Sequence, residues 1–246
     1  MQETSALYKQ LIDSDLHYFE NQLIIDGVGT FGENQLFTLD TKQPSLEGKP
    51  AIGTAPSGEI TVEVIAKSED IPKMAKLTSQ VRVTDGTQTS EWINKGIYFV
   101  DTRKESTHGS ETTTILTGYD AMIKTEQTYP NTNHDWPYLD VDVVDEIAQT
   151  IGVDVDARTY QIMTAEHMIN LPVINGDNGE DESLYTMREK LSQIAGLYCG
   201  NFIITPVGKL LLVPLYGFDP IVVGDYLADE DGNAITFGDE GWYTLV

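Results

Sequence analysis

Apolar residues alternate with polar ones in several short segments of the first half of the chain. These segments lie at 23–25, 60–64, 81–83, 96–102 and 111–119. Alternation of this kind buries one face of a β-strand and leaves the other in solvent. Asp85-Gly86 supplies the positive φ angles of a tight turn, and residues 108–110 favour another. Strands joined by short turns predict a meander, a sandwich or a barrel.

The pattern changes near residue 130. Residues 126–138 contain two prolines and no regular apolar period, which indicates a connection. Beyond it, apolar residues at helical spacing predict a helix over about 140–151, with Gly152 as the glycine that ends it. The chain is therefore predicted to change from strands before this connection to helices and strands after it.

A capping box predicts a second helix in this later part. Thr186 and Glu189 stand at the spacing at which each side chain bonds a free amide at a helix start, and an apolar stripe continues to Gly200. The segments 201–205 and 209–215 then predict a hairpin. Residues 139–215 are thus predicted to form a small α+β lobe, and the fold class is α+β, mainly β.

Composition narrows the possible functions. The 246 residues contain 39 Asp and Glu against 15 Lys and Arg, which gives a formal net charge of -24. Residues 1–130 carry a net charge of -8 and residues 131–246 carry -16. Such a chain repels phosphate backbones and anionic membrane surfaces, so we expect no specific nucleic-acid binding. A single cysteine excludes an internal disulfide.

The ends and the apolar runs predict neither a secretory signal nor a membrane span. Residues 1–15 lack a basic region followed by an apolar one. The longest compact apolar stretch, at 210–215, is far shorter than the roughly 20 residues that cross a bilayer. We expect a soluble protein made in a cytosol.

A glycine-rich segment matches a dinucleotide-binding motif only in part. Residues 27–32 read G-x-G-x-x-G and follow a strand-like segment. The pyrophosphate of a dinucleotide requires a helix next, but residues 33–44 are short, strand-like and end in proline. We favour a glycine-rich turn and expect no cofactor.

Four oxygen-bearing residues near the C-terminus match part of a calcium loop. They are Asp229, Asp231, Asn233 and Glu240. Their spacing fits the oxygen ligands of the loop, but the position of the turn glycine holds Ala234 and the flanking residues are strand-like. We favour a solvated hairpin turn at 231–232, with calcium as the alternative and no other metal site.

No catalytic motif is visible. The four histidines are scattered, and the adjacent pairs 134–135 and 166–167 do not by themselves place two side chains on one substrate atom. Cys199 stands at a helix end, where we expect a small buried residue. We assign no catalytic residue.

Four blocks of the chain stand out in collinear order: SEWINKGIYFVDTRK at 90–104, LTGYDAMIKTEQTYP at 116–130, DVVDEIAQTIGVDVDART at 142–159 and YTMREKLSQIAGLYCGNFIITPVGKLLLVPL at 185–215. Together they resemble prophage tail proteins of Gram-positive hosts, a family similar to the baseplate-hub or tail-tip hub proteins of tailed phages. The matching residues Trp92, Gly118, Tyr119, Asp120 and Pro130 also suit a framework role. Trp92 and Tyr119 are candidates for the aromatic core, and 118–120 is where a strand meets a helix start.

The resemblance implies a β-barrel-like hub domain at 1–128, an inserted α+β lobe at 129–215 and the opening of a second barrel at 216–246. This last segment is short for a barrel, so we expect a fragment, a shortened product or a variant that assembles differently. The implied protein is a virion tail component, assembled in the bacterial host cytoplasm, that joins the tail tube to the host-facing tip and helps to close the DNA channel. Its implied partners are two further copies in a homotrimer, distal tail or tube proteins and the tape-measure protein.

Two other classes of function remain as alternatives. A tail-tip cell-wall hydrolase would degrade peptidoglycan through a specific acid or histidine. An acidic inhibitor or DNA mimic would bind a basic host protein in a salt-sensitive complex.

Overall fold

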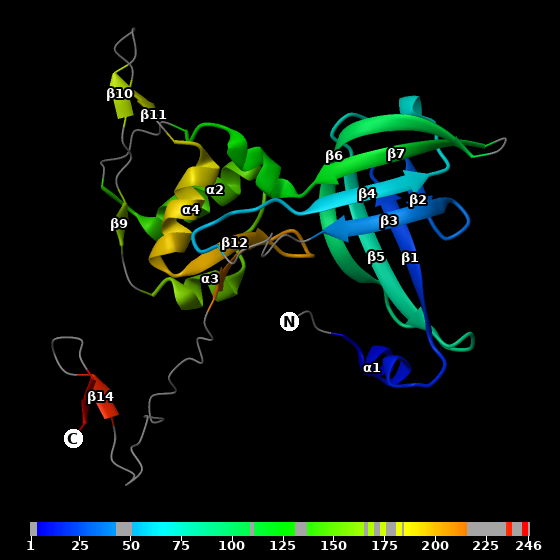
Figure 1. Ribbon diagram of the computed structural model, residues 1–246, viewed down its shortest axis with the longest axis horizontal. Coiled ribbons are helices and arrows are strands. Elements are labelled where there is room, and N and C mark those ends of the chain that lie inside the picture. Colours follow the sequence, from blue (N-terminus) through cyan, green and yellow to red (C-terminus); the bar gives the residue numbers. More distant parts are fainter. Residues whose placement is uncertain are drawn as a thin grey trace.

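The fold is α+β and mainly β, as the sequence pattern predicts. The computed structural model describes residues 4–42, 51–108, 111–130, 137–164, 167–169, 173–175, 181–183, 185–215, 235–237 and 243–245. Its two main parts are a seven-stranded antiparallel sheet and a lobe of helices around a β-hairpin, and Figure 1 shows them side by side.

The sheet has the strand order β2-β1-β5-β6-β7-β4-β3. Its strands are β1 (Tyr18–Ile25), β2 (Gly29–Phe31), β3 (Leu36–Lys42), β4 (Glu59–Val64), β5 (Lys76–Thr84), β6 (Ile93–His108) and β7 (Glu111–Tyr119). Each of the five segments with period-two alternation lies in one of these strands, so that expectation is confirmed. The short helix α1 (Ala6–Ile12) precedes β1, and the 3-10 helix η1 (Ser68–Asp70) lies between β4 and β5.

The sheet is curled like a barrel. Its two edge strands, β2 and β3, are separated in sequence by residues 32–35 alone. Across a flat sheet of seven strands the edges would lie about 29 Å apart. The connection from Phe31 to Leu36 spans at most about 18 Å. The sheet must therefore bend until its edges approach each other.

The inner face of the sheet contains the first hydrophobic core. In β4, Ile60, Val62 and Val64 are all fully buried, as their alternation predicts. Leu23, Leu77, Tyr98 and Leu116 from other strands belong to the same cluster. At about 25 cal/mol for each Å² of apolar surface, this burial is the main stabilising contribution to the sheet.

The described part of the lobe contains three α-helices. They are α2 (Asp140–Ile151), α3 (Ala157–Ile162) and α4 (Met187–Leu197), and the 3-10 helix η2 (Ala121–Glu126) precedes them. The predicted ends of α2 and α4 are confirmed. Gly152 has φ 76°, the left-handed conformation of a helix cap, and Thr186 and Glu189 form the complete capping box.

The lobe also contains a hairpin of β12 (Gly200–Ile204) and β13 (Leu210–Pro214), as predicted. Two further segments extend it, because Thr54 pairs in parallel with Asn201 of β12 and Val155 with Leu210 of β13. Thr54 lies between β3 and β4 in sequence, so part of the connection between two strands of the sheet packs in the lobe. Gly53 approaches α4 so closely that a Cβ there would lie 3.1 Å from the carbonyl oxygen of Ser192.

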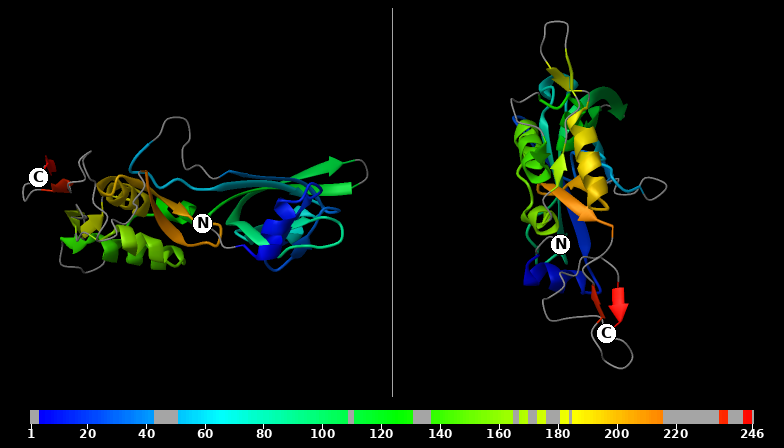
Figure 2. Two further views of the ribbon diagram at one scale, coloured as in Figure 1. Left: turned by 90° about the horizontal axis from the view of Figure 1, so that it is seen from below. Right: turned by 90° about the vertical axis from the view of Figure 1, so that its left-hand side faces the viewer.

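A second hydrophobic core holds the lobe together. It combines Ala55, Ala121, Ile147, Leu191 and Phe202, among others, from segments that are far apart in sequence. Figure 2 shows that the lobe and the sheet follow one another along the long axis of the molecule. The molecule thus has two cores with a joint between them.

Three short two-stranded ladders complete the described elements. They pair β8 (Tyr138–Leu139) with β9 (Met168–Ile169), β10 (Val173–Asn175) with β11 (Asp181–Ser183), and β14 (Ile235–Phe237) with β15 (Tyr243–Leu245). The β14–β15 pair falls within 216–246, where strand-like segments were expected.

Two expectations about single side chains are wrong. Cys199 is exposed, because it adopts φ 47° just after the end of α4 and this left-handed turn directs its side chain outward between buried Tyr198 and Gly200. Trp92 and Tyr119 are half-buried rather than core residues, since they lie next to the start of β6 and at the end of β7. Trp92 instead stacks under Arg82, whose guanidinium carbon lies 4.4 Å from the ring centroid.

Candidate functional site at the joint between sheet and lobe

Two chain segments cross side by side from the sheet to the lobe. One runs from Ala55 in the lobe core to Glu59 at the start of β4, and the other from Tyr119 at the end of β7 to Ala121 in the lobe core. Because Glu59 and Tyr119 are paired in the β4–β7 ladder, the two crossings are held in register. We call these two segments, 55–59 and 119–122, the joint.

Asp120 ties the two crossings together. Its backbone N–H donates to the carbonyl oxygen of Gly58 at 2.9 Å, and its Oδ2 accepts from the N–H of Gly58 at 2.7 Å. Its Oδ1 accepts from the N–H of Met122 at 3.0 Å, which caps η2. The prediction that a strand meets a helix start at 118–120 is confirmed. The hydrogen bond between Asp120 and Gly58 could not be predicted from the sequence.

Arg188 of α4 reaches the same joint. Its Nη2 donates to Ser57 Oγ at 2.7 Å and to the carbonyl oxygen of Met122 at 3.1 Å. Its Nε lies 3.0 Å from Glu126 Oε1, at ion-pair distance without the alignment of a hydrogen bond. One arginine of the lobe therefore contacts both crossings, and sequence reasoning did not identify it.

Burial controls the ionisation of Asp120. Its side chain is only 2% exposed, and loss of hydration raises the pKa of this carboxyl to about 7. The two N–H donors and the positive charge of Arg188 act in the opposite direction but do not cancel the effect of burial. Asp120 therefore changes charge near neutral pH.

The Tyr98 hydroxyl is a second buried polar group in the sheet close enough to Asp120 to be affected by its charge. It is fully buried and makes no hydrogen bond within the described part of the chain. Burial, and secondly the negative charge of Asp120, raise the pKa of Tyr98 to about 12. Tyr98 thus stays neutral at every pH at which the carboxyl titrates.

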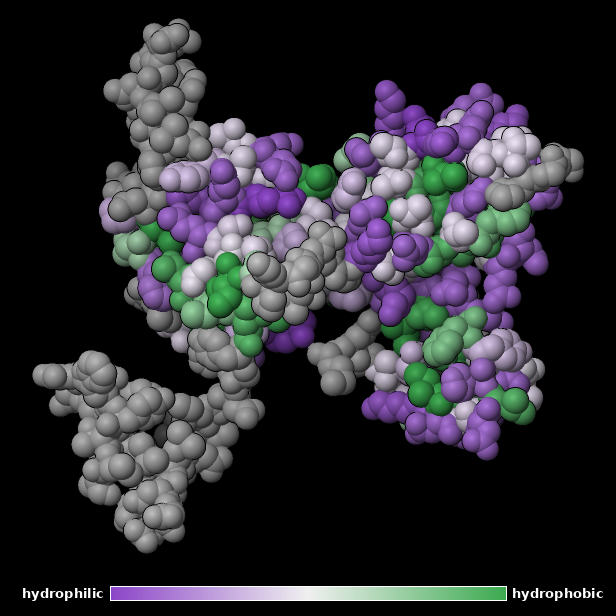
Figure 3. Space-filling model, in the orientation of Figure 1, coloured by the Kyte–Doolittle hydropathy of each residue, from purple (hydrophilic) through white to green (hydrophobic). Residues whose placement is uncertain are grey.

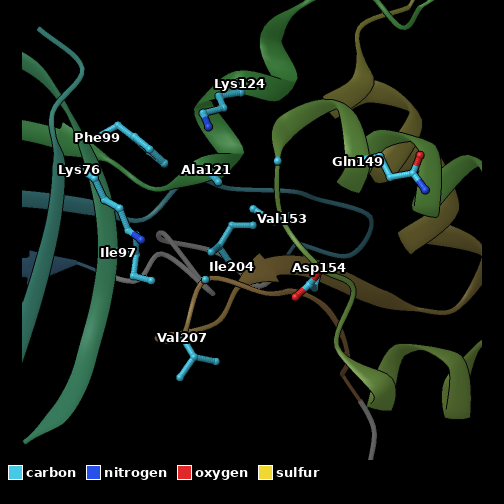
Figure 4. A pocket seen from close by; sticks show the side chains of 12 residues that line it. Lys76, Ile97, Phe99, Ala121, Lys124, Gln149, Val153, Asp154, Ile204 and Val207 are labelled. Atoms are coloured by element: carbon cyan, nitrogen blue, oxygen red, sulfur yellow. The ribbon is translucent and has the colours of Figure 1, made fainter. Parts of the chain in front are cut away.

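A cleft of about 640 Å³ opens beside the joint, between the sheet and the lobe. Phe99 and Lys76 line it from the sheet, and Lys124, Val153 and Asp154 line it from the lobe (Figure 4). Two lysines here contrast with the strong negative charge of the whole chain. The cleft is therefore lined by both apolar and charged side chains.

Lys124 contacts both the sheet and the lobe in this cleft. Its Nζ lies 4.0 Å from the centroid of the Phe99 ring and donates to the carbonyl oxygen of Ile151 at 3.1 Å. A cation at this position satisfies the C-terminal end of α2. Desolvation lowers the pKa of Lys124. Lys124 therefore links sheet and lobe through one aromatic and one helix-end contact.

A second buried polar cluster lies at the other end of α2. Tyr198 donates its hydroxyl to Asp140 Oδ2 at 2.6 Å, and His167 Nδ1 lies 3.2 Å from the same oxygen and 2.9 Å from the Tyr198 hydroxyl. Burial and the bond to Asp140 raise the pKa of Tyr198. These three side chains connect the residue before β9, the start of α2 and the residue after α4, and we interpret the cluster as a structural contact.

The other candidate residues from the sequence either lie outside the described residues or form a turn. Asp229, Asp231, Asn233 and Glu240 lie outside the described residues, as does His134. The glycine-rich segment 27–32 consists of a turn, in which Gly27 has φ 76°, and the short strand β2, and it is followed by β3 rather than by a helix. Over the residues described, no group of three or more His, Cys, Asp or Glu could hold a metal ion, and no helix is long and apolar enough to cross a membrane.

Comparisons with solved structures find similar proteins, two of which are tail proteins. No family model and no curated protein matches the chain. The tail protein from Neisseria meningitidis MC58 is 14% identical, with a TM-score of 0.45 over 79% of this chain and 50% of that chain. The 43 kDa tail protein of prophage MuSo2 from Shewanella oneidensis is 16% identical, with a TM-score of 0.49 over 85% of this chain and 60% of that chain. Both are tail proteins. This chain spans less than two thirds of the length of either.

Proposed function

We propose that this chain is a structural component of a phage or prophage tail, at the baseplate hub or tail tip. In that role it joins the tail tube to the host-facing tip and helps to close or gate the DNA channel. In this role the protein acts by assembling with other tail proteins rather than by catalysing a chemical reaction.

The observation that carries the proposal is where the four tail-protein-like blocks lie. Residues 90–104 form most of β6, and residues 116–130 form the end of β7 and continue through η2. Residues 142–159 form most of α2 and the start of α3. Residues 185–215 form α4 and the β12–β13 hairpin. The resemblance therefore covers most of the lobe core, the crossing at 119–122 and three residues of the sheet core, Tyr98, Val100 and Leu116.

Surface properties of the chain suit an assembly role. Ile12, Leu16, Tyr18 and Phe19 are all exposed around the end of α1 and the start of β1, where Figure 3 shows an apolar patch. Exposed apolar side chains that lie together are typical of surfaces that a partner covers. The net charge of -24 would also keep DNA from adhering to the protein as it passes.

The partners and location follow from this role. We propose a homotrimer with neighbours among the distal tail, tube and tape-measure proteins, in virion tails assembled in the cytoplasm of the bacterial host. A hub of this kind requires no cofactor.

Peptide mass spectrometry of tail particles from an induced culture of the source strain tests the proposal. We expect peptides of this chain to co-purify with the particles through a density gradient at a constant ratio to the tube protein. An abundant protein that stays in the soluble fraction and never sediments with particles would refute the proposal. Release of peptidoglycan fragments by the purified chain would favour the hydrolase instead.

A further inference from the structure

The cleft beside the joint holds two lysines that no carboxylate of the described residues neutralises. Lys76 and Phe99 are paired in the β5–β6 ladder, so their side chains lie on the same face of the sheet. Lys124 reaches the same ring from η2, with its Nζ 4.0 Å from the centroid. Within the described part of the chain, no carboxylate lies at ion-pair distance from either ammonium group. Two positive charges therefore lie beside one aromatic ring without a counter-charge.

The walls of this cleft are largely apolar and partly accessible. Ile97 and Phe99 of the sheet and Val153 of the lobe are half-buried, and Val207 is 46% exposed (Figure 4). The charged side chains of the lining are two lysines and one aspartate, which leaves an excess of one positive charge in a chain with a net charge of -24. The cleft therefore suits an occupant that combines carboxylates with apolar groups.

The turn between α1 and β1 has this composition. Residues 12–16 read Ile-Asp-Ser-Asp-Leu. Ile12 is 38% exposed and Leu16 is 81% exposed. Asp13 and Asp15 are exposed as well, and neither forms an ion pair with any residue that the structure describes. The turn thus offers two unpaired carboxylates and two uncovered apolar side chains.

The turn keeps its shape through contacts of its own. Ser14 Oγ lies 2.9 Å from the carbonyl oxygen of Leu11 and 3.0 Å from that of Leu16. The Nδ1 atom of His17 lies 2.9 Å from the carbonyl oxygen of Ser14. A segment that is already ordered loses less conformational entropy when it binds.

This turn does not fill the cleft of its own chain. None of residues 12–16 lines that cleft. In the β1–β5 ladder Tyr18 pairs with Thr84 and Ile25 pairs with Leu77, so the turn and Lys76 lie at opposite ends of the ladder. These ends are roughly 23 Å apart along the strands. The complementary surfaces of one chain therefore meet only between copies.

We propose that the turn at 12–16 of one copy docks in the cleft of a second copy. Its two carboxylates pair with the two lysines, and its two apolar side chains cover the apolar walls. Because the two surfaces differ, the contact is head-to-tail, and its repetition closes a ring or continues as a filament. The inference rests on the proposed function, since it names a contact between copies in the proposed homotrimer.

Analytical ultracentrifugation of the full chain tests this contact. The mass of the wild type should rise with concentration as copies associate. Lys76→Glu and Asp15→Lys should each weaken the association by about fivefold or more, because an attractive charge pair becomes a repulsive one. Lys95→Glu and Asp101→Lys make the same charge changes at exposed positions outside both surfaces, and should associate like the wild type. Circular dichroism checks that every variant is folded.

A mixture of the two variants tests the head-to-tail arrangement. The Lys76→Glu chain keeps an intact turn, and the Asp15→Lys chain keeps an intact cleft. Mixed together they should form a dimer through one intact contact and grow no further, whereas each alone associates weakly. A chain with both substitutions has opposite charges again and should recover part of the association.

Three results would overturn the proposal: a wild type that stays monomeric at every concentration tested, variants that associate as strongly as the wild type, or a mixture that forms no dimer. The failure of the proposed function gives a different result. A chain that is missing from tail particles but associates through this contact refutes the tail role alone. A chain that is present in the particles but monomeric in solution refutes the contact alone.

Discussion

The sheet and the lobe are built in contrasting ways. Most strands of the sheet pair with a neighbour that is close in sequence, and its core comes from alternating residues within 18–119. The lobe combines distant segments, and its Asn201 bonds Thr54 across 147 residues. The comparison teaches that most of the sheet is built from strands that are neighbours in sequence, with β1–β5 and β4–β7 as its long-range pairings. The lobe closes only when the β3–β4 connection returns to it.

The largest expected effects come from truncating one residue in each core. Phe202→Ala in the lobe should lower the free energy of unfolding by about 3–5 kcal/mol, and Leu116→Ala in the sheet by about 2–5 kcal/mol, because each leaves a cavity in a fully buried site. Denaturant titration followed by circular dichroism, with amide exchange to separate the regions, measures both. If the cores are separate units, each variant exposes amides of its own core first. Simultaneous loss of protection in both would contradict that separation.

Asn201→Ala tests the long-range closure of the lobe. The Asn201 side chain accepts from the N–H and hydroxyl of Thr54, each at 2.9 Å, and donates to the carbonyl oxygen of Ala51 at 2.9 Å. Loss of these bonds should destabilise the lobe by about 1–3 kcal/mol. Asn94→Ala, which removes one half-buried contact with Gln80 in the sheet, is the control and should cost less. Equal losses in denaturant titrations would show that Asn201 has no special role.

Substitutions of two glycines distinguish the cost of steric crowding from the cost of a left-handed backbone conformation. A Cβ on Gly118 would lie 2.7 Å from the carbonyl oxygen of Phe99, so Gly118→Ala should cost about 1–3 kcal/mol through overpacking of the sheet. Gly152 has open space but φ 76°, so Gly152→Ala should cost about 1–2 kcal/mol through the left-handed conformation. Thermal denaturation and a crystal structure of each variant check this. Shifted β6–β7 pairing is expected only for Gly118→Ala.

The smallest expected effect concerns the capping box of α4. Thr186→Ala removes the side chain that accepts from the N–H of Glu189, and should lower stability by about 1 kcal/mol. Thr150 lies on the exposed side of α2, so the control variant Thr150→Ala should change the free energy of unfolding by less than about 0.5 kcal/mol. Thermal denaturation distinguishes the two. Equal effects would show that the cap does not stabilise the lobe.

The same contrast explains how much the sequence could predict. The strands β4 and β7 and the helix α2 follow from local periodicity, because burial on one face imposes a period of two or of 3.6 residues. The return of residues 51–55 to the lobe has no such signal, since it depends on a contact with Asn201 far along the chain. Helix α3, with six residues, is too short to show a period.

The candidate site shows the same limit. Asp120 could be placed at a helix start from its residue type and its position after β7, but its burial against Gly58 depends on the β4–β7 pairing. Arg188 gave no signal at all, because its partners Ser57 and Glu126 come from other segments.

Electron cryo-microscopy of the tail particles tests the central claim most directly. The account predicts density at the end of the tail tube into which both the curled seven-stranded sheet and the lobe fit, with their side chains matching this sequence. A tail reconstruction whose tip and baseplate are fully assigned to other chains would contradict it.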